Sequence, residues 1–422
     1  MSCDEPRADV TEPTSLPFDE DGLPMVELSS RHLAAGVVAA SDESFGNKEH
    51  LLTPDPADFS PGTYDHRGEV VDGWETRRRR GRPGHDWVIV RLGIPGVIRR
   101  VDVDTSFFTG NYPEQCWVDA CGLEGYPGPE ELAAAQWERI ADVRPLKGDT
   151  HNLMEVTSPL RFTHLRLSVA PDGGVARLRV HGRPVIDPRH LDGVTADLAS
   201  QQLGARVIRS SDNFYGSASV LTRPDRARTM GEGWETRRRR DDGNDWAVIQ
   251  LAAAGRLRQL EVDTAHFKHN ASSDVEVRAG AMTRPADATA TEVADGRWTS
   301  VLERTALQPD TRHVFVVEPP ADEAVASYVR VDAFPDGGLS RVRVLGEVVP
   351  DARLELGLDW FNTLPLAQGH DVLRRVGLDH DTAEAVVERR PFSTLEDALG
   401  LLVGRPSDGR TQLSRLLRGP LS

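Results

Sequence analysis

Apolar and polar residues alternate in short runs along most of the chain between about residues 26 and 350. Gly or Pro interrupts these runs every 8 to 12 residues or so. Two clear examples are the segments 164–169 and 176–180. Alternation with a period of two predicts half-buried β-strands, and frequent turn signals between short strands are typical of sandwiches. We therefore expect an all-β fold made of antiparallel β-sandwiches.

The chain carries the same pattern twice. The stretch Gly73–Arg80, which reads GWETRRRR, recurs without change as Gly233–Arg240. Each copy is followed by an Asp-Trp pair that opens an apolar run, and then by a strand that ends in Asp-Thr. These pairs are Asp86-Trp87 with Asp104-Thr105, and Asp245-Trp246 with Asp263-Thr264. Two copies of about 155 to 165 residues fit two tandem jelly-roll sandwiches.

The repeats set the predicted domain boundaries. Residues 1–24 are acidic and rich in Pro without periodicity, which predicts a disordered or loosely docked tail. We place the first jelly roll at 25–186, the second at 187–350 and a C-terminal extension at 351–422. Both copies close on a Pro-Asp-Gly-Gly sequence, at 171–174 and 335–338, between alternating runs. Pro followed by Gly at this spacing predicts a β-hairpin.

Past Pro350 the spacing of apolar residues becomes helical. Asp381 and Ser393 are expected to cap helices, and Pro391 to separate two of them. We expect a small helical C-terminal extension of three or four short helices that serves for docking. Its sequence resembles, weakly, the start of the ureidoimidazoline decarboxylase family around Asn362–Pro365 and Arg390–Leu395, and equally a helix-hairpin-helix around Val376–Leu378.

Charge and cysteine content limit the partners. A net charge of -16 disfavours a nucleic-acid backbone despite the two Arg runs. Three sparse cysteines (Cys3, Cys116 and Cys121) indicate a reduced, cytoplasmic protein without a disulfide framework. No apolar run approaches the roughly 18 residues that a membrane span requires, so we expect no membrane contact.

With the repeats aligned, the chain resembles the allantoicase family. The first repeat carries the match in Asp42-Glu43, Lys48-Glu49, Asp72–Arg80, His85–Trp87 and Asp104–Tyr112, and the second adds Asp263–Lys268. The resemblance implies two galactose-binding-like jelly rolls. It also implies that the protein hydrolyses allantoate to ureidoglycolate and urea, a step of allantoin degradation in purine breakdown.

The chemistry that the resemblance implies requires a cation for the substrate carboxylate, an acid for the departing urea nitrogen and a base for water. Arg suits a carboxylate or a urea oxygen, and carboxylates suit ureido N–H groups. The expected catalytic residues are Glu75, His85, Asp104, Lys48 and Glu49. The expected substrate-binding residues are Asp42, Arg77, Arg79, Glu235, Arg237, Asp263, His266 and Lys268. Glu75 is the favoured proton carrier.

Several structural interpretations stay open beside these roles. Four consecutive Arg on a strand alternate faces, so at most two per copy can enter a site, and the run can also be a solvated stripe. Glu75 can hold an Arg or a loop, Asp104 and Asp263 can close Asx turns, and the repeated Trp residues favour the core. Asn244 replaces His85, His269 replaces Gly110, and Ala218-Ser219 replaces Lys48-Glu49. The repeats are therefore not equivalent.

We expect no cofactor. His266 and His269 could ligate a metal, but no third ligand is recognisable, so the sequence leaves a divalent metal open. The partner is the small-molecule substrate, and a duplicated domain with a helical extension favours a homo-oligomer. The alternatives are a non-catalytic tandem binding module of the galactose-binding-like kind and an inactive scaffold subunit. Strict repetition of Glu and Arg, in a chain that is only 6% aromatic, argues against a lectin-like site.

Overall fold

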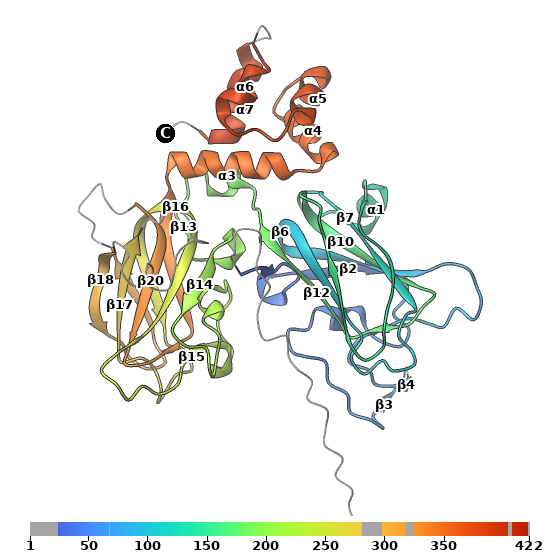
Figure 1. Ribbon diagram of the computed structural model, residues 1–422, viewed down its shortest axis with the longest axis horizontal. Helices are drawn as coiled ribbons and strands as arrows, with labels where there is room; N and C mark the ends of the chain where they lie inside the picture. The colour runs from blue at the N-terminus through green and yellow to red at the C-terminus, as the bar shows by residue number, and fades with distance from the viewer. Residues whose placement is uncertain (1–23, 67, 281–297, 318–324, 404–406, 421–422) are drawn as a thin grey trace, which may run out of the picture.

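The structure of the protein is a computed structural model that describes residues 24–66, 68–280, 298–317, 325–403 and 407–420. Two β-sandwiches lie side by side below a group of helices (Figure 1). The expected all-β fold with a helical extension is confirmed. The predicted N-terminal tail, apart from Pro24, lies outside the described residues.

One long strand organises the first sandwich because it belongs to both layers. β6 (Asp86–Asp104) pairs with β2 and β10 through its first residues, and with β12 and β9 through its last. Its pairing with β10 shifts register between Arg91 and Gly96. At Gly93 an added Cβ would lie 2.4 Å from the carbonyl oxygen of Leu33, so glycine permits the close approach of that backbone.

The two layers of the first repeat share β6. One layer has the order β2, β6, β10, β7, β8, and the other has β1, β12, β6, β9. The strands are β1 (Val26–Glu27), β2 (Gly36–Ala40), β7 (Gln115–Cys121), β8 (Glu138–Pro145), β9 (His151–Glu155), β10 (Arg161–Ala170) and β12 (Arg177–Pro184). Short elements connect them: the 3-10 helices η1 (Arg31–Leu33) and η2 (Lys48–Leu52), strands β3 (Tyr64–Asp65), β4 (Gly68–Glu69), β5 (Trp74–Glu75) and β11 (Gly174–Val175), and helix α1 (Pro129–Ala134).

The second repeat has the same topology around β16 (Asp245–Asp263). Its layers are β14, β16, β20, β17, β18 and β13, β22, β16, β19. The bounds are β13 (Ala196–Asp197), β14 (Arg206–Ser210), β17 (Asp274–Gly280), β18 (Thr299–Ala306), β19 (Arg312–Val316), β20 (Val325–Phe334) and β22 (Arg341–Val348). The short elements are η3 (Pro188–Leu191), η4 (Gln201–Leu203), η5 (Ala218–Thr222), η6 (Met230–Glu232), β15 (Trp234–Glu235) and β21 (Gly338–Leu339).

Alternation along the strands fills a separate core in each sandwich. In β6, Val88 and Val90 bury against Val101 and Val103 of the other layer, all at 0% exposure. Each fully buried Val stabilises the fold by roughly 1.5–3 kcal/mol relative to an exposed one. Cys116 and Cys121 are free and buried, and burial raises the pKa of both thiols to about 12.

The predicted Pro-Asp-Gly-Gly hairpin is wrong. β10 pairs with β6 and β7, whereas β12 pairs with β1 and β6, so the strands on either side of the turn lie in different layers. Gly174-Val175 instead forms β11, which pairs with β5. The Pro-Asp-Gly-Gly sequence does reverse the chain. After the reversal, however, the chain passes from one layer of the sandwich to the other. This crossing brings the turn to the Gly-Trp-Glu-Thr motif.

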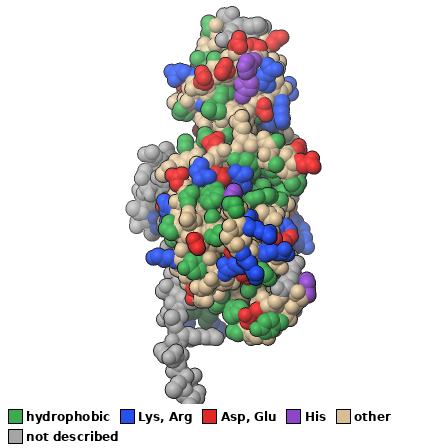
Figure 2. Space-filling model, turned by 90° about the vertical axis from the view of Figure 1, so that its right-hand side faces the viewer, with side chains coloured by type: hydrophobic (Ala, Val, Ile, Leu, Met, Phe, Trp, Pro, Cys, Tyr) green, Lys and Arg blue, Asp and Glu red, His purple; other side chains and the backbone are tan. Residues whose placement is uncertain are grey.

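Five helices of the described chain form the extension, one or two more than predicted. They are α3 (Pro350–Thr363), α4 (Leu366–Arg375), α5 (His380–Glu388), α6 (Leu395–Gly400) and α7 (Ser407–Arg418). The caps are Asp379 and Thr394 rather than the predicted Asp381 and Ser393. α3 runs across the top of the sandwiches, and the other helices form a lobe above it (Figure 1). This lobe projects from the top of the molecule in Figure 2. Arg183 of β12 donates to both carboxylate oxygens of Asp359, at 2.6 and 2.9 Å.

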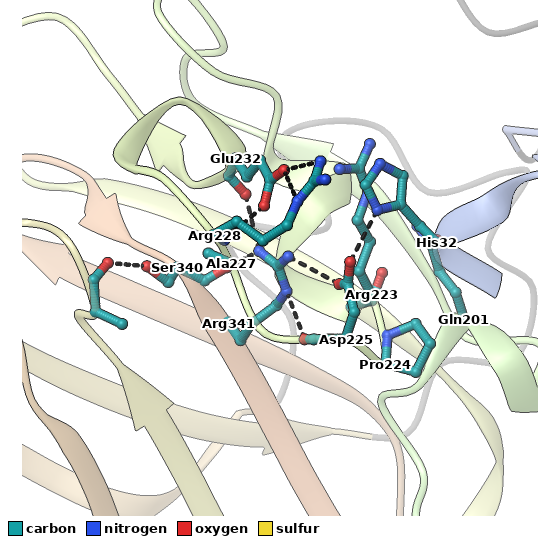
Figure 3. Close-up of polar contacts among 12 residues, drawn as sticks. His32, Gln201, Arg223, Pro224, Asp225, Ala227, Arg228, Glu232, Ser340 and Arg341 are labelled. Atoms are coloured by element: carbon teal, nitrogen blue, oxygen red, sulfur yellow. Dashed lines mark hydrogen bonds and ion pairs between the residues drawn. The ribbon is translucent and has the colours of Figure 1, made fainter. Parts of the chain in front are cut away.

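The two repeats contact each other through a partly buried ionic cluster (Figure 3). Nδ1 of His32, in the first repeat, lies 2.8 Å from Oδ2 of Asp225, in the second. Arg341, which is 2% exposed, donates to Oδ1 of the same carboxylate at 2.8 Å. Burial alone raises the pKa of Asp225, but the hydrogen bonds from His32 and Arg341 outweigh it and lower the pKa to about 2.

This depressed pKa predicts a pH-dependent contribution to stability. The folded pKa of Asp225 lies below its ordinary value of 3.8, so the carboxylate stabilises the protein above that pH and loses its effect as pH falls toward about 2. We expect Asp225→Asn to lower the midpoint of guanidinium unfolding at pH 7, and the deficit to shrink at pH 3. Asp142→Asn on the exposed face of β8 is the control. An equal deficit at both pH values would contradict the ionic role.

Candidate active site

The Gly-Trp-Glu-Thr motif places a glutamate at the loop end of each sandwich. Trp74 is fully buried, and its Nε1 donates to the carbonyl oxygen of Asp42 at 2.7 Å. The backbone of Glu75 pairs with Gly174, and its carbonyl accepts from the N–H of Gly46 at 3.1 Å. The backbone of Glu75 is hydrogen-bonded on both sides, and the buried Trp74 holds the preceding residue. The position of the Glu75 backbone, from which its side chain projects, is therefore fixed.

An asparagine from a distant loop holds the Glu75 carboxylate. Nδ2 of Asn111 donates to Oε1 of Glu75 at 2.9 Å. Burial raises the pKa of Glu75, and the Asn111 hydrogen bond and the charge of Arg78 counteract this in part, while the charge of Asp172 adds to it. The net pKa of Glu75 is raised. The carboxyl therefore keeps its proton to a higher pH than an exposed glutamate does.

The second repeat builds the same pair. Nδ2 of Asn270 donates to Oε1 of Glu235 at 2.7 Å, and Nε1 of Trp234 donates to the carbonyl of Asp212 at 2.9 Å. The Pro-Asp-Gly-Gly turn is tied to the motif in both repeats as well. Oγ1 of Thr76 accepts from the N–H of Gly173 at 3.1 Å, and Thr236 accepts from Gly337 at 2.7 Å. The two copies of the motif therefore hold Glu75 and Glu235 by the same set of hydrogen bonds.

The comparisons with known proteins agree with this duplication. The Allantoicase repeat family matches residues 26–185 and 196–349. A probable allantoicase of Nocardia farcinica is 48% identical over 324 residues, which are 76% of this chain and 94% of the relative. A probable allantoicase of Streptomyces coelicolor is 43% identical over 355 residues, 81% of this chain and 89% of the relative. The chain belongs to the allantoicase family.

A solved structure gives the same result. The crystal structure of allantoicase from Saccharomyces cerevisiae superposes with a TM-score of 0.64 at 31% identity, over 78% of this chain and 94% of the yeast chain. The allantoicase fold therefore accounts for both sandwiches. The family match ends at residue 349, so the helical extension lies beyond it.

Within this allantoicase frame, the Arg run does not form the predicted strand. After β5 the backbone is irregular, and Arg79 is half-buried whereas Arg77, Arg78 and Arg80 are exposed. Arg79 donates to the Asp86 carboxylate at 2.6 Å and to the carbonyl of His85, and Arg239 likewise binds Asp245. Arg79 was predicted to bind substrate. Its guanidinium instead makes these two hydrogen bonds, which hold the loop to the start of β6.

The charge of the neighbouring Arg78 acts on the Glu75 carboxyl. Arg78 donates to Oδ1 of Asp172 at 3.1 Å, and its side chain is 47% exposed. The backbone N–H of Arg77 donates to Oδ1 of Asp42 at 2.8 Å, while its side chain is exposed. In the second repeat, Arg237 lies over the ring of Phe214 at 4.2 Å and near the Asp212 carboxylate at 3.9 Å. Arg77, Arg78 and Arg237 are all exposed.

Lys48 and Glu49 form local ion pairs rather than contacts to the Glu75 carboxylate. Nζ of Lys48 donates to Glu43 at 3.0 Å, and Glu49 pairs with Arg31. The second repeat replaces the latter pair by Nε2 of Gln201 donating to the carbonyl of Ser219. The matched replacement indicates that Glu49 joins η1 to η2, which is a structural role.

Asp104 and Asp263 close turns, the alternative left open by the sequence. Oδ1 of Asp104 accepts from the N–H and Oγ of Ser106 at 2.8 and 2.6 Å, and Asp263 accepts from the N–H of Ala265 at 2.8 Å. Asp104 is 4% exposed. Both carboxylates therefore shape the loops that lead to Asn111 and Asn270.

The remaining predicted residues lie around the two loops. The His85 ring packs on Trp117 with centroids 4.8 Å apart, and burial and the charges of Arg79 and Arg166 lower its pKa. Nε2 of His266 lies 2.9 Å from the carbonyl of Ala227, and Lys268 is exposed. Among the described residues, no three His, Cys, Asp or Glu side chains are grouped to hold a metal ion.

Sequence reasoning missed Asn111, Asn270, Arg78 and Asp172. A signal existed, because each Asn follows the Asp of its Asp-Thr pair by seven residues in both copies. Each Asp of the Pro-Asp-Gly-Gly turn also accepts from the backbone of the Arg run: Asp172 from Arg79 and Asp336 from Arg239.

No helix of the described chain is long and apolar enough to cross a membrane.

Proposed function

We propose that the protein hydrolyses allantoate to ureidoglycolate and urea, with proton transfer by Glu75. Its membership of the allantoicase family supports the reaction. The observation that supports the site is the glutamate held by an asparagine at the same place in both repeats, at 2.9 Å for Glu75 and 2.7 Å for Glu235. A fixed, partly desolvated carboxyl with a donor on one oxygen is suited to acid–base work.

The reaction places the oxygen of water on the carbon that carries the two ureido groups. The bond from that carbon to one ureido nitrogen breaks, and the nitrogen takes up a proton and leaves as urea. In this proposal Glu75 gives its proton to the leaving nitrogen and recovers one from the attacking water. Glu75 is therefore protonated again at the end of the reaction. Its raised pKa favours the protonated form that the first step requires.

The other residues of the site bind and orient the substrate in this proposal. Asn111 fixes Oε1 of Glu75 by a hydrogen bond and leaves Oε2 for the substrate. Arg77 and Arg78 supply donors for the substrate carboxylate or a urea oxygen. Arg237 and Glu235 offer the corresponding groups in the second repeat. His85, Lys268 and His266 lie on surrounding loops and set the shape of the opening.

The test of the reaction is urea release from allantoate by the purified full chain. We expect stoichiometric urea and ureidoglycolate. Failure to release urea, with or without added divalent metal, would overturn the enzymatic proposal and favour a tandem binding module. In that case calorimetry would detect binding of allantoate without its hydrolysis.

Removing the amide of Asn111 is expected to move the pH profile. The hydrogen bond from Asn111 lowers the pKa of Glu75 and opposes the effect of burial, so Asn111→Leu raises this pKa further. Because the protonated carboxyl is the active form here, activity declines as pH rises through its pKa. The alkaline limb of kcat/KM therefore shifts to higher pH in the variant. Asn270→Leu is the control, and an unmoved limb in Asn111→Leu would contradict the assignment.

We also infer a cytoplasmic homo-oligomer. The two described cysteines are buried free thiols, which suits a reducing compartment. Val314 and Val316 of β19 are 52% and 74% exposed on an edge strand, which favours contact with another copy. Light scattering on the full chain tests this, and a monomer at micromolar concentration would overturn it.

A further inference from the structure

The last helix of the extension borders an open groove of about 520 Å³. α7 lines it with the side chains of Arg410, Arg415 and Arg418, and Leu399 of α6 and Pro420 add apolar surface. Figure 1 shows α7 in the lobe above α3, at the opposite end of the molecule from β15. The groove shares no residue with the candidate active site.

The groove is basic. The described residues that line it include three Arg and neither an Asp nor a Glu. All three arginines are exposed, and none has an ion pair or a hydrogen-bond acceptor for its guanidinium among the described residues. The chain as a whole carries 66 acidic against 50 basic residues. A cationic surface without local carboxylates therefore stands out in this protein and suits an acidic ligand.

The other contacts of α7 fix the position of the groove. Leu413, Leu416 and Leu417 are buried in the core of the lobe. Arg353 of α3, which is 5% exposed, donates to the carbonyl of Leu417 at 3.0 Å and to Asp192 at 2.7 Å. The apolar face of α7 and its C-terminal end are therefore held by the protein, and the three arginines lie on the face that remains.

The opposite end of the chain has the complementary charge. Residues 1–23, which lie outside the described residues, contain seven Asp or Glu and one Arg. Within them the apolar run Leu16-Pro17-Phe18 directly precedes Asp19-Glu20-Asp21. Three consecutive acidic residues match the three arginines in number, and the apolar run matches the apolar surface beside them.

The acidic segment is long enough to reach the groove. The described chain begins at Pro24, whose carbonyl accepts from Nη1 of Arg206 in β14 at 3.3 Å. Fully extended, a segment of 23 residues spans up to about 76 Å, whereas a compact chain of 422 residues has a radius of gyration of about 22 Å. The segment and α7 both lie outside residues 26–349, which contain the family match, so the allantoicase repeats account for neither.

We propose that the groove along α7 binds the segment Leu16–Asp21 of the same chain. The three carboxylates of this segment pair with the three arginines, since a guanidinium offers a carboxylate two parallel donors. The apolar run covers Leu399 and Pro420. Exposed ion pairs are weak singly and are screened by salt, so docking depends on several of them together. The proposal is independent of the reaction proposed for Glu75.

The test places a nitroxide spin label at residue 15 of the full chain, directly before the proposed segment. In the Cys3→Ser, Ser15→Cys chain the label reacts at residue 15, because Cys116 and Cys121 are buried and burial raises the pKa of their thiols to about 12. Electron paramagnetic resonance then measures the rotational correlation time of the label. The readout needs no enzymatic activity.

Two triple variants, each with a control of equal charge change, test the two partners. The groove variant is Arg410→Gln, Arg415→Gln and Arg418→Gln. Its control changes three exposed arginines elsewhere in the lobe, Arg374→Gln, Arg375→Gln and Arg389→Gln. The segment variant is Asp19→Asn, Glu20→Gln and Asp21→Asn. Its control changes three acidic residues further from the apolar run, Asp4→Asn, Glu5→Gln and Asp9→Asn.

A restrained label is expected in about 0.1 M salt, where charges act over about 10 Å, and a mobile label in about 1 M salt, where they act over about 3 Å. The groove variant and the segment variant shorten the correlation time in low salt as far as high salt does, and neither control shortens it. The segment variant changes no residue of the described lobe, so the test holds even where the groove variant unfolds. The guanidinium unfolding midpoint of each variant identifies that case.

Four results would overturn the proposal. They are a mobile label in low salt, an unchanged correlation time in a folded groove variant or in the segment variant, an equal loss of restraint in the controls, and a restraint that disappears on dilution. The last result would assign the groove to a second copy of the chain rather than to its own N-terminal segment.

Discussion

Replacing Glu75 by Gln is expected to lower kcat for urea release by about 10²–10⁴, the range for a lost general acid–base residue. The substitution keeps the shape of the side chain and an oxygen that can accept from Asn111, which donates to Glu75 at 2.9 Å. What it removes is the proton that the leaving nitrogen takes. Steady-state urea release from allantoate measures the effect, and a variant with more than a tenth of wild-type activity would contradict the role.

Stability separates this role from a structural one. Burial raises the pKa of Glu75 in the folded protein, so the folded state binds a proton more tightly than the unfolded chain and loses stability as pH rises through that interval. Glu75→Gln removes this loss. We therefore expect an inactive variant that unfolds at the wild-type guanidinium midpoint or above it at pH 7. Glu235→Gln is the matched comparison in the second repeat.

Replacing Arg177 by Ala is expected to reduce the free energy of unfolding by about 3–5 kcal/mol, as when one partner of a buried ion pair is removed. The side chain is 2% exposed. It donates to both carboxylate oxygens of Asp72, at 3.1 and 2.6 Å, and to the carbonyls of Asp55 and Pro56. Burial raises the pKa of Asp72, yet the Arg177 hydrogen bond and charge bring it below its ordinary value.

Because Asp72 directly precedes the Gly-Trp-Glu-Thr motif, the Arg177 variant is also expected to lose activity. Guanidinium unfolding measures the stability change. Arg100→Ala is the control, since Arg100 pairs with Glu155 on the exposed surface and such pairs contribute about 0–1 kcal/mol. A loss of less than 1 kcal/mol in Arg177→Ala would show that the loop before the motif is held by other contacts.

The fold could be predicted largely because it is written in local patterns. Alternation with a period of two and the doubled GWETRRRR stretch predict two sandwiches without long-range information. Turn residues give the place of a reversal but not the partner of the strands, so 171–174 was misassigned as a hairpin when β10 and β12 lie in different layers. The domain boundaries and the resemblance of the extension to the decarboxylase family stay predictions.

The site was predicted only in part, because its contacts join loops far apart in the chain. Glu75 lies in a motif that draws attention by its repetition, whereas Asn111, 36 residues further on, looks like an ordinary loop residue. Consecutive Arg residues gave no sign that Arg79 binds Asp86 while Arg78 binds Asp172. Ionic partners within a loop, such as Glu43 for Lys48, are likewise set by the backbone path rather than by spacing.

The most direct test of the central claim is a crystal structure of the Glu75→Gln variant with allantoate. The account predicts allantoate at the loop end of the first repeat, with a ureido nitrogen within hydrogen-bond distance of residue 75 and the carboxylate on Arg77 or Arg78. Allantoate bound in the second repeat alone, or away from both glutamates, would contradict the assignment of proton transfer to Glu75.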